Sequence, residues 1–303
     1  LAVAVAAALV VPTQATFAQD ENLTEEVVVI GTRTEGRSAL DSPAPVDVIG
    51  GETMSNQGDT DMSNLLRNVV PSYNVNDQPI SDAATLVRPA NLRGLAPDHT
   101  LMLVNGKRRH RASVITWLGN GISNGSQGPD AAAIPALALK RIEVLRDGAS
   151  AQYGSDAIAG VMNFVLNDAR EGGSVEVRYG EYNEGDGEQV TIAGNIGLPL
   201  GDSGFLNLTA EWGESVPTSR SEQRADAQGL IDDGYQNVPV PAMIWGRPIV
   251  SDDLKLWANF GVDLSDTLEL YGHANYNSKE VDGGFFFRNP TNQIGRASCR
   301  ERV

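Results

Sequence analysis

The stretch GFLNLTAEWG, residues 204–213, alternates apolar and polar side chains from Leu206 to Trp212. Side chains of a strand point alternately to its two faces, so this stretch predicts a strand with one apolar and one polar face. The same alternation recurs in residues 174–182, 188–198, 254–263 and 267–279. Five such segments of about ten residues are typical of the wall of a transmembrane β-barrel. A soluble β-sandwich produces the same alternation, so the pattern alone leaves both folds open.

The connections between these segments favour the barrel. The stretches GDSG (201–204) and LSD (264–266) predict tight turns, whereas residues 214–253 form a long polar loop. Short turns at one end and long loops at the other are typical of outer-membrane barrels. No apolar run reaches the roughly 18–20 residues that a membrane-spanning helix needs, so any crossing of a membrane would use strands.

The composition excludes several classes of function. The 303 residues include 23 basic and 39 acidic side chains, a net charge of −16. This balance argues against a nucleic-acid partner, because a basic face is needed to neutralise phosphates. The single cysteine, Cys299, excludes an internal disulfide framework and any zinc site built from cysteines.

The N-terminal residues predict export from the cytoplasm. Residues 1–11 read LAVAVAAALVV, and Pro12 and the small-residue stretch ATFA (15–18) follow. This is the pattern of a signal peptide cleaved after Ala18, although a short buried helix has the same apolar run. Export without a useful cysteine indicates the periplasm or the outer membrane of a Gram-negative cell.

The first half of the chain predicts a small α+β unit. Thr60 and Asp61 predict the N-cap of a helix that ends before Pro71. The stretch LMLVNGKRR (101–109) predicts a hairpin, because Asn-Gly is the preferred type I′ turn. Residues 142–146 and 161–166 predict two further strands.

Four stretches of this unit resemble the TonB-dependent outer-membrane receptors: EEVVVIGTR (25–33), NLRGL (91–95), LMLVNGK (101–107) and KRIEVLRDGASAQYGSDAIAGVMNFVL (140–166). The resemblance implies an α+β plug domain followed by antiparallel strands of a transmembrane β-barrel of the roughly 22-stranded type. It also implies import of a scarce solute, driven through TonB and its inner-membrane energising complex. Beyond residue 171 the resemblance is one of pattern only.

The resemblance places the contact with TonB at Glu26, Val27, Val28, Val29 and Ile30. A β-branched segment near a free terminus can add a strand to the edge of a partner's sheet. The same residues also suit an ordinary first strand of the plug. Both interpretations hold only if the strand is free before TonB engages it.

Other residues resemble the polar contacts that hold the plug in its barrel. Arg93, Glu143 and Arg146 stand on or at the ends of predicted strands, and in the family such arginines pair with carboxylates of the barrel. The alternative is that they are ordinary solvated side chains at strand ends.

The stretch 117–129 predicts a loop at the apex of the plug. Trp117, Asn120, Ser123, Asn124 and Gln127 supply stacking and hydrogen-bonding groups for a polar solute, although a plain surface loop has the same composition.

Catalytic and metal-binding patterns are weak. The stretch GISNG (121–125) has the letters of a nucleophile elbow, but the glycine-rich residues around it do not predict the strand and helix that an elbow needs. His99, His110 and His273 lack the spacing of a metal site. The sequence therefore predicts no enzyme, no metal site and no cofactor.

The expected organisation has five parts: a signal-peptide remnant (1–18), the TonB box and linker (19–41), the plug (42–168), the first barrel strands (169–293) and a non-native tail (294–303). About 130 residues yield only five or six strands, too few to close such a barrel, so we expect a truncated chain. The tail, IGRASCRERV, resembles a translated sequencing adapter.

The sequence thus predicts part of an outer-membrane importer that contacts lipid, TonB and a small solute such as a ferric siderophore, another metal chelate or a glycan. Two alternatives remain. One is a receptor that signals across the membrane, which would carry an extra domain before the TonB box. The other is a secreted, soluble β-rich binding protein, which would lack a lipid-facing band.

Overall fold

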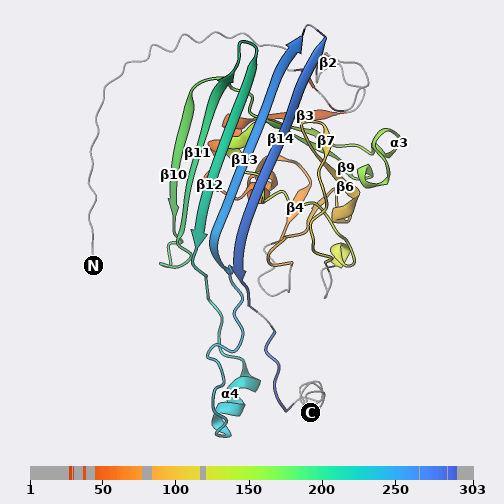
Figure 1. Ribbon diagram of the computed structural model, residues 1–303. Helices are drawn as coiled ribbons and strands as arrows, with labels where there is room; N and C mark the ends of the chain where they lie inside the picture. The colour runs from red at the N-terminus through yellow and green to blue at the C-terminus, as the bar shows by residue number, and fades with distance from the viewer. Residues whose placement is uncertain are drawn as a thin grey trace, which may run out of the picture.

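The computed structural model describes residues 27–28, 30, 37–38, 45–76, 84–116, 121–265, 267–284 and 286–291. In this part of the chain, an N-terminal α+β unit packs against a tilted antiparallel sheet (Figure 1). We call the unit, residues 45–166, the plug, and the sheet the wall. The predicted signal peptide, most of the predicted linker and the predicted tail lie outside the described residues.

The plug is built around a five-stranded sheet with the order β3-β8-β9-β6-β7. Only β6 and β9 run parallel to each other in it. The strands of the N-terminal part are β1 (Val27–Val28), β2 (Arg37–Ser38), β3 (Val46–Gly50), β4 (Tyr73–Val75), β5 (Ala90–Leu92), β6 (Thr100–Val104), β7 (Lys107–Arg108), β8 (Leu139–Leu145) and β9 (Gly160–Leu166). The helices are α1 (Gly51–Ser55), α2 (Met62–Val69) and α3 (Ser150–Tyr153), with short 3-10 turns η2 (Pro97–His99), η3 (Gly121–Ser123), η4 (Ala136–Ala138) and η5 (Ser155–Ala157).

Local sequence signals explain how these elements begin and turn. The Asp61 side chain accepts a hydrogen bond from the backbone N–H of Asn64 at 3.1 Å, which is the N-cap that the sequence predicts for α2. Asn105 and Gly106 have φ of 47° and 72°, as a type I′ turn requires, and they connect β6 to β7. The predicted helix and hairpin are therefore confirmed.

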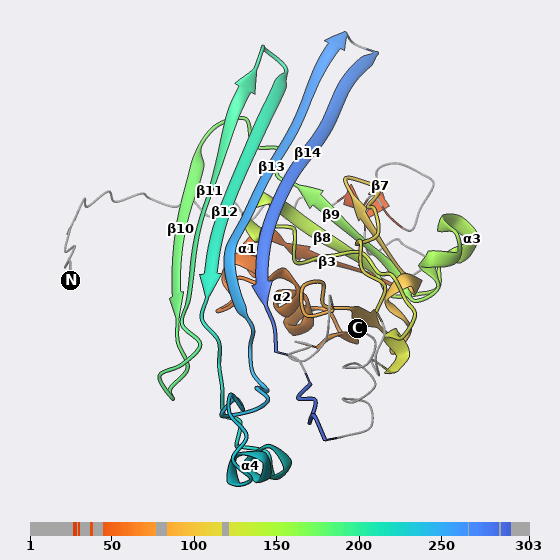
Figure 2. The same ribbon diagram turned by 60° about the horizontal axis from the view of Figure 1, so that its bottom comes forward.

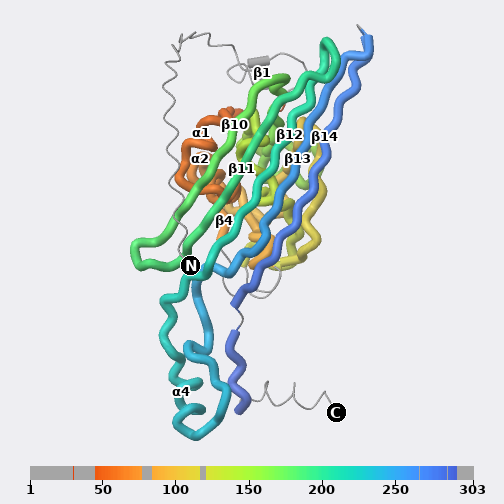
Figure 3. Tube along the Cα trace, turned by 60° about the vertical axis from the view of Figure 1, so that its left-hand side comes forward, coloured from red at the N-terminus to blue at the C-terminus, as the bar shows by residue number. Residues whose placement is uncertain are grey.

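The wall is a five-stranded antiparallel meander, β10 (Gly173–Gly180), β11 (Gln189–Leu200), β12 (Gly204–Ser215), β13 (Ile249–Ser265) and β14 (Leu268–Asp282). The strands lie at the five predicted segments, although β13 and β14 are longer than predicted. Figure 3 shows them side by side and slanted, with the connection between β12 and β13 projecting beyond one end. This connection contains the helix α4 (Ala225–Asp232), which sequence analysis described only as a polar loop.

The two faces of the wall have the reverse polarity of a soluble sheet. Large apolar side chains are exposed on the outer face, among them Val175 (80% exposed), Ile192 (45%) and Leu208 (37%). The inner face, toward the plug, buries polar side chains: Thr191, Asn195, Asn207, Thr209, Glu211, Lys255 and Asn259. A soluble sandwich would bury its apolar face, so the arrangement favours a barrel wall whose outer face meets lipid. The fold is a plug followed by antiparallel strands of a barrel that is not closed in the described residues.

Among the described residues, no helix is long and apolar enough to span a membrane.

Among the described residues, one side chain of the wall joins the main apolar core of the plug. The largest cluster of buried residues includes Met62, Leu66, Ile142 and Phe164 of the plug together with Trp257 of β13. Figure 2 shows α1 and α2 beside the wall strands, on the side that faces the plug sheet. The inner face of the wall is therefore mostly polar, with one large apolar side chain inserted into the plug.

Candidate functional site at the interface of plug and wall

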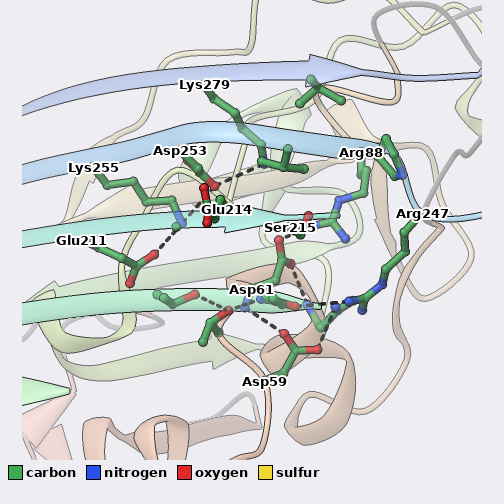
Figure 4. A pocket seen from close by; sticks show the side chains of 18 of the residues that line it. Asp59, Asp61, Arg88, Glu211, Glu214, Ser215, Arg247, Asp253, Lys255 and Lys279 are labelled. Carbon is green, nitrogen blue, oxygen red and sulfur yellow. Dashed lines mark hydrogen bonds and ion pairs between the residues drawn. The ribbon is translucent and has the colours of Figure 1, made fainter. Parts of the chain in front are cut away.

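A polar cavity of about 100 Å³ lies between α2 and the inner face of the wall. It lies toward the end of the wall from which the long connection 216–248 projects, because Ser215 and Arg247 line it. Figure 4 shows that its charged side chains come from both the plug and the wall. The lining residues are Asp59, Thr60, Asp61, Asn64, Thr85, Arg88, Gln189, Thr191, Glu211, Gly213, Glu214, Ser215, Arg247, Pro248, Val250, Asp253, Lys255, Lys279 and Val281.

On the plug side, the segment before α2 presents two carboxylates to the cavity. Asp59 accepts hydrogen bonds from the backbone N–H of Asp61 and from the Asn64 side chain, both at 2.9 Å. Asp61 pairs with the guanidinium of Arg88. Burial acts to raise the pKa of Asp61, but the charge and the hydrogen bond of Arg88 overcome it and hold this pKa well below its ordinary value.

On the wall side, a chain of ion pairs crosses β12, β13 and β14. Lys255 Nζ lies 2.6 Å from Glu211 Oε1 and 3.7 Å from an oxygen of Asp253. Lys279 Nζ lies 3.4 Å from the same carboxylate. The Lys255 and Glu211 side chains are only 6% and 7% exposed, so each depends on the other for compensation of its charge.

The turn between α1 and α2 is attached to the wall by a guanidinium. Arg178 of β10 donates to the carbonyl oxygens of Gln57 and Asp59, both at 2.6 Å, and to that of Ser55. These carbonyls lie at or just beyond the end of α1, where the helix has no further backbone N–H groups to donate to them. A cation is therefore favourable there. Glu176, on the same strand, pairs with Arg178 and fixes its orientation.

Two side chains of β11 hold the next residue of this turn. Gln189 Nε2 donates to Thr60 Oγ1 at 2.5 Å, and Thr191 Oγ1 lies 3.3 Å from the same hydroxyl. Together with Arg178, they attach residues 55–60 to the first two strands of the wall.

A second set of contacts lies near the other plug segments. Trp257 Nε1 donates to the carbonyl of Ala133 at 3.0 Å, and the guanidinium carbon of Arg109 lies 5.4 Å from the centroid of the Trp257 ring. Asn259 Oδ1 accepts from Asn105 at 3.1 Å. Most of the interface thus consists of hydrogen bonds and ion pairs, which water can replace when they separate.

The three residues predicted to contact the barrel have neighbours within the plug. Arg93 Nη1 lies 3.8 Å from Asp147, and Arg146 donates to Asp47 at 2.8 Å. Glu143 is fully buried; it pairs with Arg141 at 2.9 Å and accepts from Asn163 at 3.1 Å. The pairing of these residues with barrel carboxylates stays a prediction.

The predicted solute loop is closed at its base by backbone hydrogen bonds, such as the one from Ala112 N to the Gly128 carbonyl at 3.0 Å. Ser123 is buried and Gln127 donates to the Ala112 carbonyl at 2.7 Å, so both support the loop itself. Asn124 is exposed. Trp117 and Asn120 lie outside the described residues, and solute contact by this loop stays a prediction.

In the described residues, the GISNG stretch is not followed by the helix that a nucleophile elbow needs. Residues 121–123 are a single 3-10 turn, followed by Gly125 at φ 80°. An elbow requires a strand before the serine and a helix after it. Within the described residues, no group of three or more His, Cys, Asp or Glu side chains has an arrangement that could hold a metal ion.

The predicted TonB segment is partly described. Val27 and Val28 pair antiparallel with Ser38 and Arg37, which makes a two-stranded sheet of β1 and β2. Ile30 is 1% exposed and belongs to a small apolar cluster with Leu101, Leu103, Leu145, Ala157 and Val161. Glu26 and Val29 lie outside the described residues, and the contact with TonB stays a prediction.

Sequence analysis did not single out the residues that join plug and wall in the structure: Arg178, Thr60, Gln189, Thr191, Lys255, Glu211, Trp257 and Asn259. Their alternation placed Arg178, Thr191, Glu211, Lys255, Trp257 and Asn259 on one face of the predicted strands. The alternation predicts on which face of a strand a side chain lies, but it does not predict the residue that this side chain contacts. The contacting residues are up to 131 residues away in the chain.

Comparison with known proteins gives a consistent result. A family model described as "TonB-dependent Receptor Plug Domain" matches residues 38–161. The chain is 30% identical over 247 residues to the vitamin B12 transporter BtuB of Photobacterium profundum, covering 80% of this chain and 36% of that protein. It is 29% identical over 196 residues to the iron-regulated outer membrane virulence protein of Vibrio cholerae, covering 63% and 28%. These relatives are named as a transporter and an outer-membrane protein, not as enzymes.

Solved structures show the same fold. The crystal structure of a ferric enterobactin receptor mutant of Pseudomonas aeruginosa (PfeA), in complex with enterobactin, superposes with a TM-score of 0.62 at 21% identity, covering 83% of this chain and 36% of that one. The siderophore receptor PirA of Acinetobacter baumannii gives 0.55 at 22% identity, covering 83% and 34%. The chain thus spans roughly a third of the length of these proteins. The plug match places residues 38–161 in the TonB-dependent receptor plug family, and the relatives and the outward-facing apolar surface of the wall make the chain as a whole similar to the TonB-dependent outer-membrane receptors.

Proposed function

We propose that the protein to which this chain belongs imports a small solute across the outer membrane, using energy that TonB delivers from the inner membrane. The observation that carries the proposal is the interface between plug and wall. This interface is held mainly by hydrogen bonds and ion pairs, such as the hydrogen bond from Arg178 to the carbonyl of Asp59. It lies on the inner face of the wall, whose outer face is apolar and suits lipid. Such contacts can be exchanged for water, so the plug can shift without exposing a large apolar surface.

The partners follow from the same proposal. TonB would engage residues 26–30 by strand addition, after β1 has separated from β2 and Ile30 has left its apolar cluster. The loop around the exposed Asn124 would contribute to solute contact from the plug apex. The organisation into signal peptide (1–18), linker (19–41), plug (42–168) and barrel strands (169–293) belongs to this proposal.

The class of solute follows only from the relatives. Their names include ferric enterobactin receptors and a vitamin B12 transporter, so a metal chelate is the first class to test, with a glycan as the second. All of these solutes carry several hydrogen-bonding groups, which suits the polar lining of the cavity.

The test is uptake by cells that carry or lack the intact gene. Radiolabelled ferric enterobactin, vitamin B12 and a set of oligosaccharides would be offered to wild type, the deletion strain and a strain without TonB. We expect one solute to accumulate in a manner that requires both the gene and TonB. Uptake that requires the gene but persists without TonB would contradict the proposal.

A further inference from the structure

One large apolar side chain of the wall stands among polar neighbours. Trp257 of β13 is only 3% exposed, and the inward residues before and after it on this strand are Lys255 and Asn259. Its cross-strand partner on β12 is Thr209. In the apolar cluster to which the ring belongs, all the other residues lie in the plug. The indole ring is therefore buried by the plug and not by its own sheet.

Two segments of the plug meet this ring. In the first segment, the carbonyl of Ala133 accepts a hydrogen bond from Trp257 Nε1 at 3.0 Å. Ala131 and Ile134, on either side of that carbonyl, belong to the same apolar cluster as the ring. From the second segment, the guanidinium carbon of Arg109 lies 5.4 Å from the ring centroid. The ring thus has an apolar, a hydrogen-bonding and a cationic partner, all in the plug.

The plug holds these two segments together by its own hydrogen bonds. Arg109 Nε donates to the carbonyl of Asp130 at 3.3 Å. The Asp130 side chain accepts from the backbone N–H of Ala132 at 2.9 Å, and the N–H of Ile134 donates to the carbonyl of Ala131 at 3.1 Å. The wall takes no part in these bonds, so the plug itself forms the site that receives Trp257.

This contact differs in kind from the others between plug and wall. Water can replace a hydrogen bond such as the one from Asn105 to Asn259 when its partners separate. Water cannot replace the burial of an indole ring, because exposure of apolar surface is unfavourable. Separation of the plug from β13 therefore meets its main resistance at Trp257.

We propose that Trp257 is the positioning residue that holds the plug in place as the seal of the barrel. The inner face of the wall is polar, so a barrel whose plug is displaced would contain a water-filled lumen. Loss of Trp257 should therefore make the receptor leak ions. This role goes beyond the import function, and its test requires no solute.

The full-length receptor, reconstituted in lipid bilayers, tests the proposal with two readouts. The first is ion conductance across the bilayer. The second is the rate at which a water-soluble thiol reagent labels Ala132→Cys, in a receptor whose other cysteines are replaced by serine. Ala132 precedes Ala133 in the chain and is 7% exposed, so the labelling rate reports opening of the contact with Trp257.

Trp257→Ala should raise both the conductance and the labelling rate, the latter by roughly tenfold or more, because it removes the large buried side chain of this contact. Trp257→Phe keeps an apolar ring and should stay much nearer to wild type. Asn259→Ala, two positions along the same strand, should have a smaller effect than Trp257→Ala, because water replaces its lost hydrogen bond.

Trp212→Ala is the matched control, because Trp212 lies on β12 with its side chain on the opposite, outer face of the wall. It should behave as wild type in both readouts. Resistance of the barrel to SDS without heating shows that each variant has folded. If Trp257→Ala fails this check, Trp257→Leu, which keeps a smaller apolar side chain, takes its place under the same criteria.

Two results would overturn the proposal. Wild-type conductance and labelling in a folded Trp257→Ala or Trp257→Leu receptor would show that the polar contacts alone hold the plug. An equal rise in Trp257→Ala and Trp212→Ala would show that any loss of tryptophan loosens the wall, and that the contact of Trp257 with the plug has no special part.

Discussion

The guanidinium of Arg178, on the first strand of the wall, donates a hydrogen bond of 2.6 Å to the backbone carbonyl of Asp59, which lies 119 residues earlier in the plug. The interaction is with backbone oxygens, so it constrains the path of the turn and not the identity of its side chains. A barrel residue thus holds, through main-chain contacts, a plug segment whose Asp59 and Thr60 line the polar cavity.

Replacement of Arg178 by Gln should loosen this turn. Hydrogen bonds that involve a charged group contribute about 1.5–3 kcal/mol, and the variant loses several of them at once. We expect faster proteolysis within residues 55–61 of the purified receptor. Arg224→Gln is the matched control, because Arg224 pairs only locally with Asp226 near the start of α4 among its described contacts. Identical digestion of all three proteins would contradict the assignment of Arg178 as an anchor.

Because Lys255 and Glu211 form a buried ion pair, the effects of replacing each of them on stability should be strongly non-additive. Lys255→Met leaves the buried Glu211 carboxylate without its partner, which should cost about 3 kcal/mol of stability. Lys255→Met combined with Glu211→Leu removes both charges and should recover most of that loss. Thermal unfolding of the detergent-solubilised full-length proteins measures both. A double variant less stable than either single variant would show that the two side chains do not act as a pair.

Asp61 predicts a dependence of stability on pH. Arg88 holds the pKa of Asp61 below its ordinary value in the folded protein, so the folded state favours the carboxylate. The resulting stabilisation is fully present above the unfolded pKa of about 3.9 and is lost as pH falls through the lower folded pKa. Asp61→Asn keeps a capping side chain but has no charge to titrate.

Unfolding of wild type and Asp61→Asn should therefore differ most between pH 5 and 7, roughly, and converge in strong acid. The measurement is the unfolding midpoint of both proteins in a pH series. A constant difference across the series would mean that the charge of Asp61 contributes nothing.

The outer face of the wall predicts sensitivity to charge. Leu208 of β12 is 37% exposed on the apolar face, next to the buried polar Asn207. Arginine at a lipid-facing position near the bilayer midplane costs about 2–4 kcal/mol, and less nearer the interfaces. We expect Leu208→Arg to reduce assembly of the receptor into lipid vesicles, whereas Leu208→Phe should assemble normally. Normal assembly of Leu208→Arg would show that this face does not meet lipid.

The predicted TonB segment is tested by two variants of Val28. Proline removes the backbone N–H and fixes φ, so it should prevent strand addition, whereas Val28→Thr keeps the N–H and β-branching. We expect Val28→Pro to lose uptake but retain solute binding, and Val28→Thr to keep both. In the structure Val28 pairs with Arg37, so Arg37→Pro, on the other strand, controls for loss of the β1–β2 pairing alone. Uptake by Val28→Pro equal to wild type would place the coupling site elsewhere.

The sequence by itself determined the local elements of this protein. The alternation around Leu208 predicted the strand β12, Asn105 and Gly106 predicted the hairpin turn, and Asp61 predicted the start of α2. Each of these signals lies within a few residues of the element it specifies, because strand period, turn conformation and helix capping are set by neighbouring residues.

Only the tertiary structure decided which face of the wall meets the plug and which side chains join them. Alternation has the same period in a sandwich and in a barrel, so the outward orientation of Val175 and Ile192 could not be derived from it. The contact of Arg178 with Asp59 depends on how two distant segments pack, and no local interaction encodes that pairing. The contacts of Glu143 were equally beyond the sequence: the fold buries it beside Arg141 and Asn163, which lie on β8 and β9.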